Sequence, residues 1–136
     1  MNAAGITRRT TLRGLLGCIA MLPTVAATGR FVQNDSSNEL ARRMTAIYSS
    51  GFSAALIGKE YLRNAEHEGS SVTLQELISE GRNSKSDMCM LDNGQLHASL
   101  RSWIRDDFCS GRTVQVQGWI LSVTEARLMA LTAVLG

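Results

Sequence analysis

The clearest pattern along the chain is an alternation of apolar and polar residues over positions 113–121. Val114, Val116 and Ile120 occupy alternate positions, and two glutamines stand between them. Because successive side chains of a strand point to opposite faces, this alternation predicts one half-buried β-strand. Trp119 falls on the glutamine face of that strand.

Helical periodicity dominates the segment from residue 39 to residue 64. Apolar residues recur there at intervals of three and four, which predicts either the longest helix or two helices broken near residues 49–51. One face of this segment carries only small residues, which permits close helix approach. We expect this face to pack within the protein, with a partner surface as the alternative; its residues are Ser50, Ala54, Ala55 and Gly58.

Capping sequences predict where three further helices begin. Thr73 and Glu76 form a T-x-x-E capping box, and Ser122 and Glu125 form an S-x-x-E capping box. Asp92, or the asparagine after it, suits the start of a helix that ends near residue 109. The expected fold class is therefore mainly α: a small helical domain of about four helices with one or two short β-strands.

The N-terminal sequence resembles an export signal. A basic segment precedes an apolar run at residues 15–27, and small residues favour cleavage after Ala27. Arg8, Arg9 and Leu12 resemble the recognition residues of a twin-arginine (Tat) signal, which predicts export to the periplasm by the Tat translocase. A Sec signal that happens to hold two arginines is the alternative. The apolar run is shorter than the roughly 20 residues of a transmembrane helix, so we expect no stable membrane span.

This interpretation divides the chain into a signal peptide over 1–27, a flexible leader over 28–38 and one helical domain over 39–136. The full chain has 136 residues and a formal net charge of +2. Cleavage after residue 27 removes three arginines and no acid, which leaves 11 basic and 12 acidic residues. A mature chain without excess positive charge argues against a nucleic-acid partner.

The cysteines raise three hypotheses. Cys18 lies in an L-L-G-C sequence, so lipidation is an alternative to its removal with the signal. Cys89 and Cys109 would remain in an oxidising compartment, where we expect them to form a disulfide. Cys89, its flanking methionines and His97 include soft copper ligands, but their spacing favours a buried apolar cluster, and we expect no metal site.

No sequence motif identifies a catalytic centre or a cofactor site. Glycine-rich phosphate loops and the nucleophile and zinc motifs of hydrolases are missing from the sequence. Asp106 and Asp107 are neighbours that would diverge on a helix, so they do not suit a catalytic pair. We expect both to be solvated, with Arg101, Arg105 or Arg112 as alternative partners. The sequence therefore predicts a protein that is not an enzyme and holds no cofactor.

The predicted strand instead suggests a binding surface, because its backbone hydrogen-bonding groups need partners. Residues 87–91 are the best internal candidate for a second strand, and the edge of a sheet in another protein is the alternative. Trp119 stands beside a glycine, where an exposed indole would suit a binding hot spot; a core tryptophan is the alternative. The candidate partner-binding residues are Val114, Val116 and Trp119.

The pattern D-F-x-x-G-R-x-V-x-V-x-G-W-x-L-S-x-T-E-A-R-L, from residue 107 to residue 128, resembles the C-terminal end of small Tat-signal proteins of proteobacteria. The position of Met129 is often cysteine in that pattern. The resemblance implies export and small size, and similar exported polypeptides serve as subunits of periplasmic dehydrogenases. The expected function is a non-catalytic small subunit or maturation partner of a larger periplasmic oxidoreductase. A stand-alone periplasmic binding or stress protein is the alternative.

Overall fold

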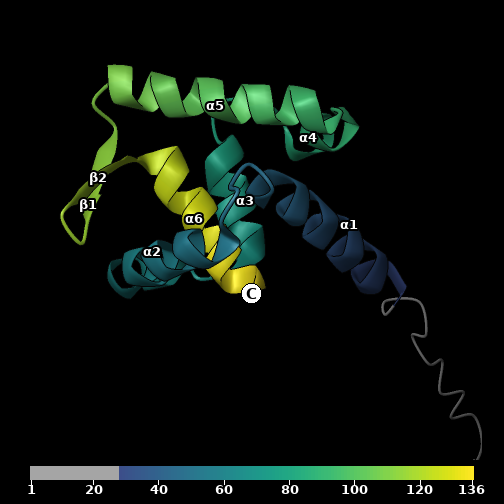
Figure 1. The fold of residues 1–136 in the computed structure, drawn as a ribbon. Helices are drawn as coiled ribbons and strands as arrows, with labels where there is room; N and C mark the ends of the chain where they lie inside the picture. Colours follow the sequence, from purple (N-terminus) through teal and green to yellow (C-terminus); the bar gives the residue numbers. More distant parts are fainter. Residues whose placement is uncertain (1–27) are drawn as a thin grey trace, which may run out of the picture.

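The computed structural model describes residues 28–136 and confirms the mainly α-helical class (Figure 1). One two-stranded antiparallel sheet interrupts the helices between α5 and α6. Within the described residues, no helix is both long and apolar enough to cross a bilayer. The elements are α1 (Thr28–Thr45), α2 (Gly51–Asn64), a 3₁₀ turn η1 (Glu66–Glu68), α3 (Ser71–Ser79), α4 (Lys85–Met90), α5 (Asn93–Cys109), β1 (Thr113–Val116), β2 (Trp119–Ser122) and α6 (Val123–Leu135).

Helix α6 forms the centre of the domain. It contacts α1, α2, α3, α5 and both strands, and Figure 1 shows the other helices placed around it. Leu128 and Leu131 are completely buried, and so are Ala126 and Ala130. A helix with apolar residues around most of its circumference is stable only when other elements surround it. The packing around α6 therefore determines the positions of the other helices.

The small-residue face of α2 packs against α6. Ala54 and Gly58 are both buried, and a Cβ atom added to Gly58 would lie 2.0 Å from the carbonyl oxygen of Met129. Only a residue without a side chain permits this approach of two backbones. The expectation of packing within the protein is confirmed.

The first predicted helical segment is two helices, because α1 ends at Thr45 and α2 begins at Gly51. The structure differs from the expected flexible leader, since residues 28–38 belong to α1. Ser37 is buried on α1, and its side chain contacts α3 and α4. Its Oγ accepts hydrogen bonds from Lys85 Nζ at 2.7 Å and from the buried Gln75 Nε2 at 3.3 Å.

Two capping predictions are confirmed and one is wrong. The side chains of Asp92 and Ser122 accept hydrogen bonds from backbone amides three residues later, at 2.8 Å and 2.9 Å. Helix α3, however, begins one turn before Thr73, and Ser70 is its N-cap, with its Oγ accepting from the Thr73 amide at 3.0 Å. Both Ser70 and Thr73 suit a cap, and the earlier residue adds a turn of helix.

Residues 87–91 do not form a strand, so that prediction is wrong. Most of this segment belongs to the short helix α4, which begins with a reciprocal capping box between Ser84 and Asp87. Met88 is buried, but Cys89 and Met90 are exposed, so the expected apolar cluster is only partly formed. The capping box stabilises a helix of only six residues. Hydrophobic periodicity alone does not reveal a helix this short.

The predicted single strand is a β-hairpin that provides its own pairing. Val116 pairs with Trp119, and between them Gln117 and Gly118 have φ angles of 51° and 84°. Positive φ at both central residues is typical of the tight turn that joins twisted antiparallel strands. Because paired residues project to the same side, Trp119 shares the face of Val116, and Ile120 shares the opposite face with Gln115. The prediction that Trp119 lies on the glutamine face and Ile120 on the valine face is therefore wrong.

We predict that Gly58→Ala destabilises the protein by about 2 kcal/mol or more, because the added methyl group must separate α2 from α6. Chemical denaturation followed by circular dichroism measures the change. Gly51→Ala is the matched control in the same helix, since its added Cβ would meet only Thr132 Cγ2 at 3.9 Å. We expect the control to change stability by less than about 1 kcal/mol, in the stabilising direction. Equal effects of the two substitutions would contradict the close-packing account.

Candidate functional site

The structure brings Val114, Val116 and Trp119 together on one face of the hairpin but leaves only Trp119 largely exposed. Arg8, Arg9 and Leu12 lie outside the described residues. Val116 is buried and Val114 is partly buried, so the first is not available to a partner. Trp119 keeps 64% of its surface exposed.

The predicted disulfide between Cys89 and Cys109 is wrong. Both cysteines are free and exposed. Cys89 belongs to α4, beside the start of α5, and Cys109 is the last residue of α5 (Figure 1). A helix of 17 residues is about 25 Å long, which is far beyond the span of a disulfide. The two cysteines are therefore held apart by the length of α5.

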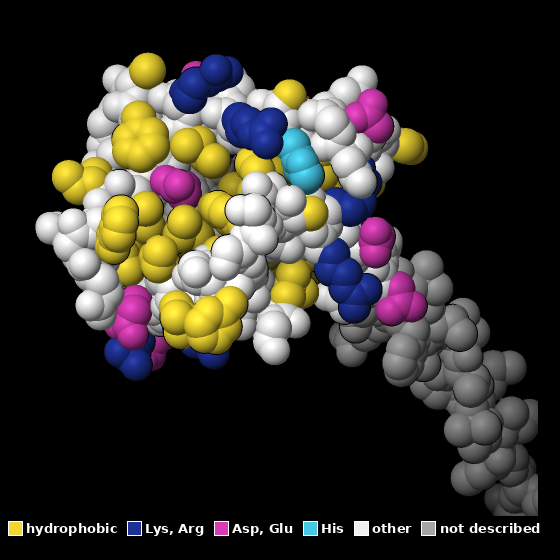
Figure 2. Space-filling view, in the orientation of Figure 1, with side chains coloured by type: hydrophobic (Ala, Val, Ile, Leu, Met, Phe, Trp, Pro, Cys, Tyr) yellow, Lys and Arg dark blue, Asp and Glu magenta, His cyan; other side chains and the backbone are white. Residues whose placement is uncertain are grey.

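Trp119 and Ile120 leave both faces of β2 apolar and exposed, and we call these two side chains together the hairpin surface. Ile120 is 67% exposed on the opposite face from Trp119. In Figure 2, hydrophobic side chains are concentrated on the left of the molecule, in the region where Figure 1 places the hairpin between α5 and α2. The turn is tied to α2 because Gln117 Nε2 donates to Glu60 Oε2 at 2.9 Å. An exposed tryptophan is thus presented by a hairpin that is fixed at its turn.

A buried carboxylate fixes the other end of the hairpin. Asp107, only 1% exposed, lies on α5, and its Oδ1 accepts hydrogen bonds from Arg82 Nη2 at 2.7 Å and from Arg112 Nη2. Its Oδ2 accepts from the backbone amide of Thr124 at 2.7 Å, in the first turn of α6. The carboxylate therefore joins α5 to the residue before β1 and to the helix after β2. We call these four residues the Asp107 cluster.

Arg82 completes the cluster from the chain segment after α3. Its Nη1 donates to Thr124 Oγ1 at 2.8 Å, and its guanidinium lies 5.0 Å from the ring centroid of the buried Trp103. The expectation that Asp107 is solvated is wrong. Of the partners considered for it, Arg112 is correct, and Arg82 was not anticipated because it is 25 residues away in sequence.

The surroundings of Asp107 stabilise its charged form. Burial alone would raise the pKa of this carboxyl, but hydrogen bonds from the Thr124 side chain and backbone and the charges of Arg82 and Arg112 outweigh burial. The pKa of Asp107 therefore lies below its ordinary value. A carboxylate with both oxygens occupied in this way serves as a structural anchor.

A second ion cluster joins α6 to α2 and to the 3₁₀ turn η1. Arg127 donates to both carboxylate oxygens of Glu68, at 2.9 Å and 3.1 Å, and Tyr61 Oη donates to the same group at 2.8 Å. Burial would raise the pKa of Glu68, but hydrogen bonds from Arg127 and Tyr61 hold it below its ordinary value. Burial and the neighbouring Glu68 raise the pKa of Tyr61 to about 12. These groups satisfy one another, so they also have a structural role.

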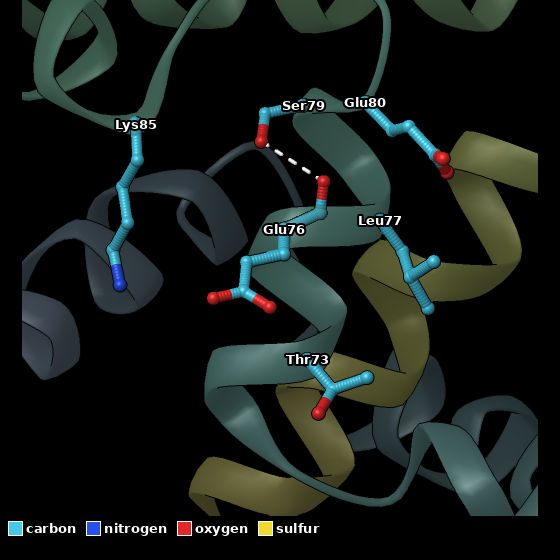
Figure 3. A pocket seen from close by; sticks show the side chains of 6 residues that line it. All are labelled: Thr73, Glu76, Leu77, Ser79, Glu80 and Lys85. Carbon is cyan, nitrogen blue, oxygen red and sulfur yellow. Dashed lines mark hydrogen bonds between the residues drawn. The ribbon is translucent and has the colours of Figure 1, made fainter.

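The groove along α3, with a volume of about 450 Å³, does not assemble reactive groups (Figure 3). The hydroxyl of Ser79 donates to the backbone carbonyl of Glu76 at 3.0 Å, within its own helix. Glu80 and Leu77 lie on the side of α3 away from Lys85 in Figure 3. Among the described residues, no three His, Cys, Asp or Glu side chains are grouped as a metal site would require. The hairpin surface is therefore the best candidate functional site.

Comparisons with models of protein families, with curated proteins and with solved structures find no match for this chain.

We predict that Asp107→Asn destabilises the protein by about 3 kcal/mol or more at pH 7, because it leaves two arginines without their anion. The asparagine oxygen can still accept the Thr124 amide, so the substitution isolates the effect of charge. Urea denaturation measures the change. Asp106→Asn is the matched control, since Asp106 is an exposed neighbour whose side chain makes no ion pair among the described residues. Similar losses in both variants would contradict the role of Asp107.

The loss of stability caused by Asp107→Asn should depend on pH. Because the folded-state pKa of Asp107 is lowered, its contribution to stability is present above its unfolded pKa of about 3.9 and is lost as the pH falls through the folded value. The difference in unfolding free energy between the wild type and Asp107→Asn should therefore shrink below about pH 4. Urea titrations of both proteins at pH 7 and pH 3 measure this difference. A difference that stays constant would contradict the lowered pKa.

Proposed function

We propose that this chain is an exported, non-catalytic small subunit or maturation partner of a larger periplasmic oxidoreductase. The hairpin surface is the contact with that partner. The observation that supports this proposal best is the exposure of Trp119 and Ile120 on a hairpin that is fixed at both ends.

Exposed aromatic side chains on a fixed support are favourable binding elements. Tryptophan is enriched among the interface residues whose substitution by alanine causes the largest loss of binding free energy. Binding also costs less conformational entropy when the contact residues are ordered beforehand. The hydrogen bonds of Gln117 to Glu60 and of Thr124 to Asp107 order the hairpin in this way.

The N-terminal sequence supports the export part of the proposal. Arg8, Arg9 and Leu12 follow the pattern that the Tat translocase recognises. This translocase carries folded proteins, often those that receive a cofactor before export. A larger partner that carries the cofactor would explain why a chain of 136 residues without a cofactor motif has such a signal.

We predict that Trp119→Ala weakens binding of the larger chain by about 30-fold, as expected for a hot spot worth about 2 kcal/mol. The full chain is tagged and purified from periplasm, and the co-purifying protein is quantified together with its flavin, haem or molybdenum spectrum. Met90→Ala is the matched control, because Met90 is 89% exposed on α4, at the other end of α5.

We expect the wild type and Met90→Ala to retain the large chain and Trp119→Ala to lose it while its circular dichroism spectrum stays unchanged. Equal retention by both variants would show that the hairpin surface is not the contact. A colourless wild-type monomer would contradict the subunit proposal itself.

We predict that replacing Arg8 and Arg9 by lysine abolishes export, because the Tat machinery distinguishes the guanidinium pair from ammonium groups. Cell fractionation with immunoblotting measures the periplasmic share of the protein. Replacing Arg13 alone by lysine is the control, since it makes the same chemical change outside the pair. Undiminished periplasmic protein in the double variant would indicate the Sec route.

A further inference from the structure

A cleft separate from the hairpin surface lies where α1 ends, α2 begins and α6 ends. Its volume is about 430 Å³, and residues of all three helices line it. Figure 1 shows the end of α6 beside the start of α2, away from the hairpin. Small-molecule sites in proteins typically have volumes of about 300–1,000 Å³, so the cleft is large enough for a small ligand.

The cleft combines an apolar lining with two positive charges. Phe52, Ala55 and Leu135 supply apolar surface, and Phe52 is 77% exposed. The hydroxyls of Thr45 and Thr132 donate to backbone carbonyls of Arg42 and Leu128 within their own chain segments, so neither hydroxyl depends on a ligand. A large aromatic side chain left in water at the edge of an apolar cleft would be covered by a bound ligand.

The two cations at the cleft are Arg42 and Lys59. None of the described residues that line the cleft is an Asp or Glu, and Gly136, the last residue of the sequence, lines it without forming an ion pair among the described residues. Among the described residues, neither cationic side chain takes part in any of the ion pairs or hydrogen bonds that hold the domain together. By contrast, Arg82 and Arg127 are fully engaged with carboxylates inside the domain. Arg42 and Lys59 are therefore available to an anionic ligand.

We propose that this cleft binds an anionic amphiphile, a carboxylate on an unbranched alkyl chain. The alkyl chain lies against Phe52, Ala55 and Leu135, and the carboxylate lies between Arg42 and Lys59. The charge complementarity disfavours cationic amphiphiles. It also disfavours the apolar run of the chain's own N-terminus, which follows three arginines and no acid. This inference goes beyond the partner role proposed above and does not depend on it.

The test uses the full chain and dodecanoate as the probe, titrated by isothermal calorimetry below its micelle concentration. We expect dodecanoate to bind with a stoichiometry of one. Octanoate and decanoate should bind more weakly, by about fourfold for each methylene removed. Dodecyltrimethylammonium, with the same chain and the opposite charge, should bind at least tenfold more weakly than dodecanoate.

Substitutions of the cationic side chains test whether dodecanoate binds in this cleft. Arg42→Gln combined with Lys59→Gln should weaken dodecanoate binding at least tenfold and leave binding of the cationic amphiphile unchanged or stronger. Arg63→Gln is the matched control, because Arg63 is an exposed cation on α2 that pairs with Glu60 at 2.7 Å and does not line the cleft. Because all three side chains are exposed, the circular dichroism spectrum should be unchanged.

Three results would overturn the proposal. The first is no binding of dodecanoate, and the second is equal affinity for the two amphiphiles, which would indicate unspecific hydrophobic adsorption. The third is a concentration-dependent dimer that Phe52→Ser dissociates, because it would assign the cleft to a second copy of the chain. None of these readouts involves the hairpin surface, so a failed partner assay would not affect this test.

Discussion

The carboxylate of Asp107 is the constraint on which the arrangement of the C-terminal third depends. It accepts hydrogen bonds from Arg82, Arg112 and the Thr124 amide, which belong to three different parts of the chain. A buried charge without such partners would cost several kcal/mol, so the folded state requires these segments to meet at one point. A backbone hydrogen bond beside these contacts also closes the base of the hairpin, since Val123 donates its amide to the Arg112 carbonyl at 3.1 Å.

The acidic and basic groups in the interior pair with one another, through Asp107 and its arginines and through Glu68 and Arg127. Among the described residues, two surfaces are the candidate sites: the hairpin surface, which is apolar and fixed, and the cleft at the ends of α1 and α6, which is apolar and carries two cations. The first suits a protein partner and the second suits an anionic ligand. Both depend on helix α6, whose two ends they flank.

Local signals in the sequence predicted a good part of the fold. Asp92 and Ser122 were identified as helix caps because capping depends on residues only three positions apart. The mainly α-helical class followed from periodicity, and the small face of α2 followed from Gly58 and its neighbours. Such features are fixed by neighbouring residues, so a sequence pattern can reveal them.

The features that were missed depend on less local interactions. The turn at Gln117 and Gly118 was hidden because the apolar alternation continues across it, which led to Trp119 being placed on the wrong face. The burial of Asp107 depends on Arg82, which is distant in sequence and carries no local mark of the pairing. The exposed indole of Trp119 was anticipated as a binding element, but its fixed support was not.

Native-state hydrogen exchange at the Thr124 amide tests the central claim most directly, because this N–H donates to the buried Asp107 carboxylate. If the carboxylate holds the hairpin to α6, the Thr124 amide exchanges only on global unfolding. Its opening free energy then equals that of the amides of Leu128 and Leu131 in the buried part of α6. Exchange of Thr124 through a local opening, orders of magnitude faster than exchange at those two leucines, would contradict the account.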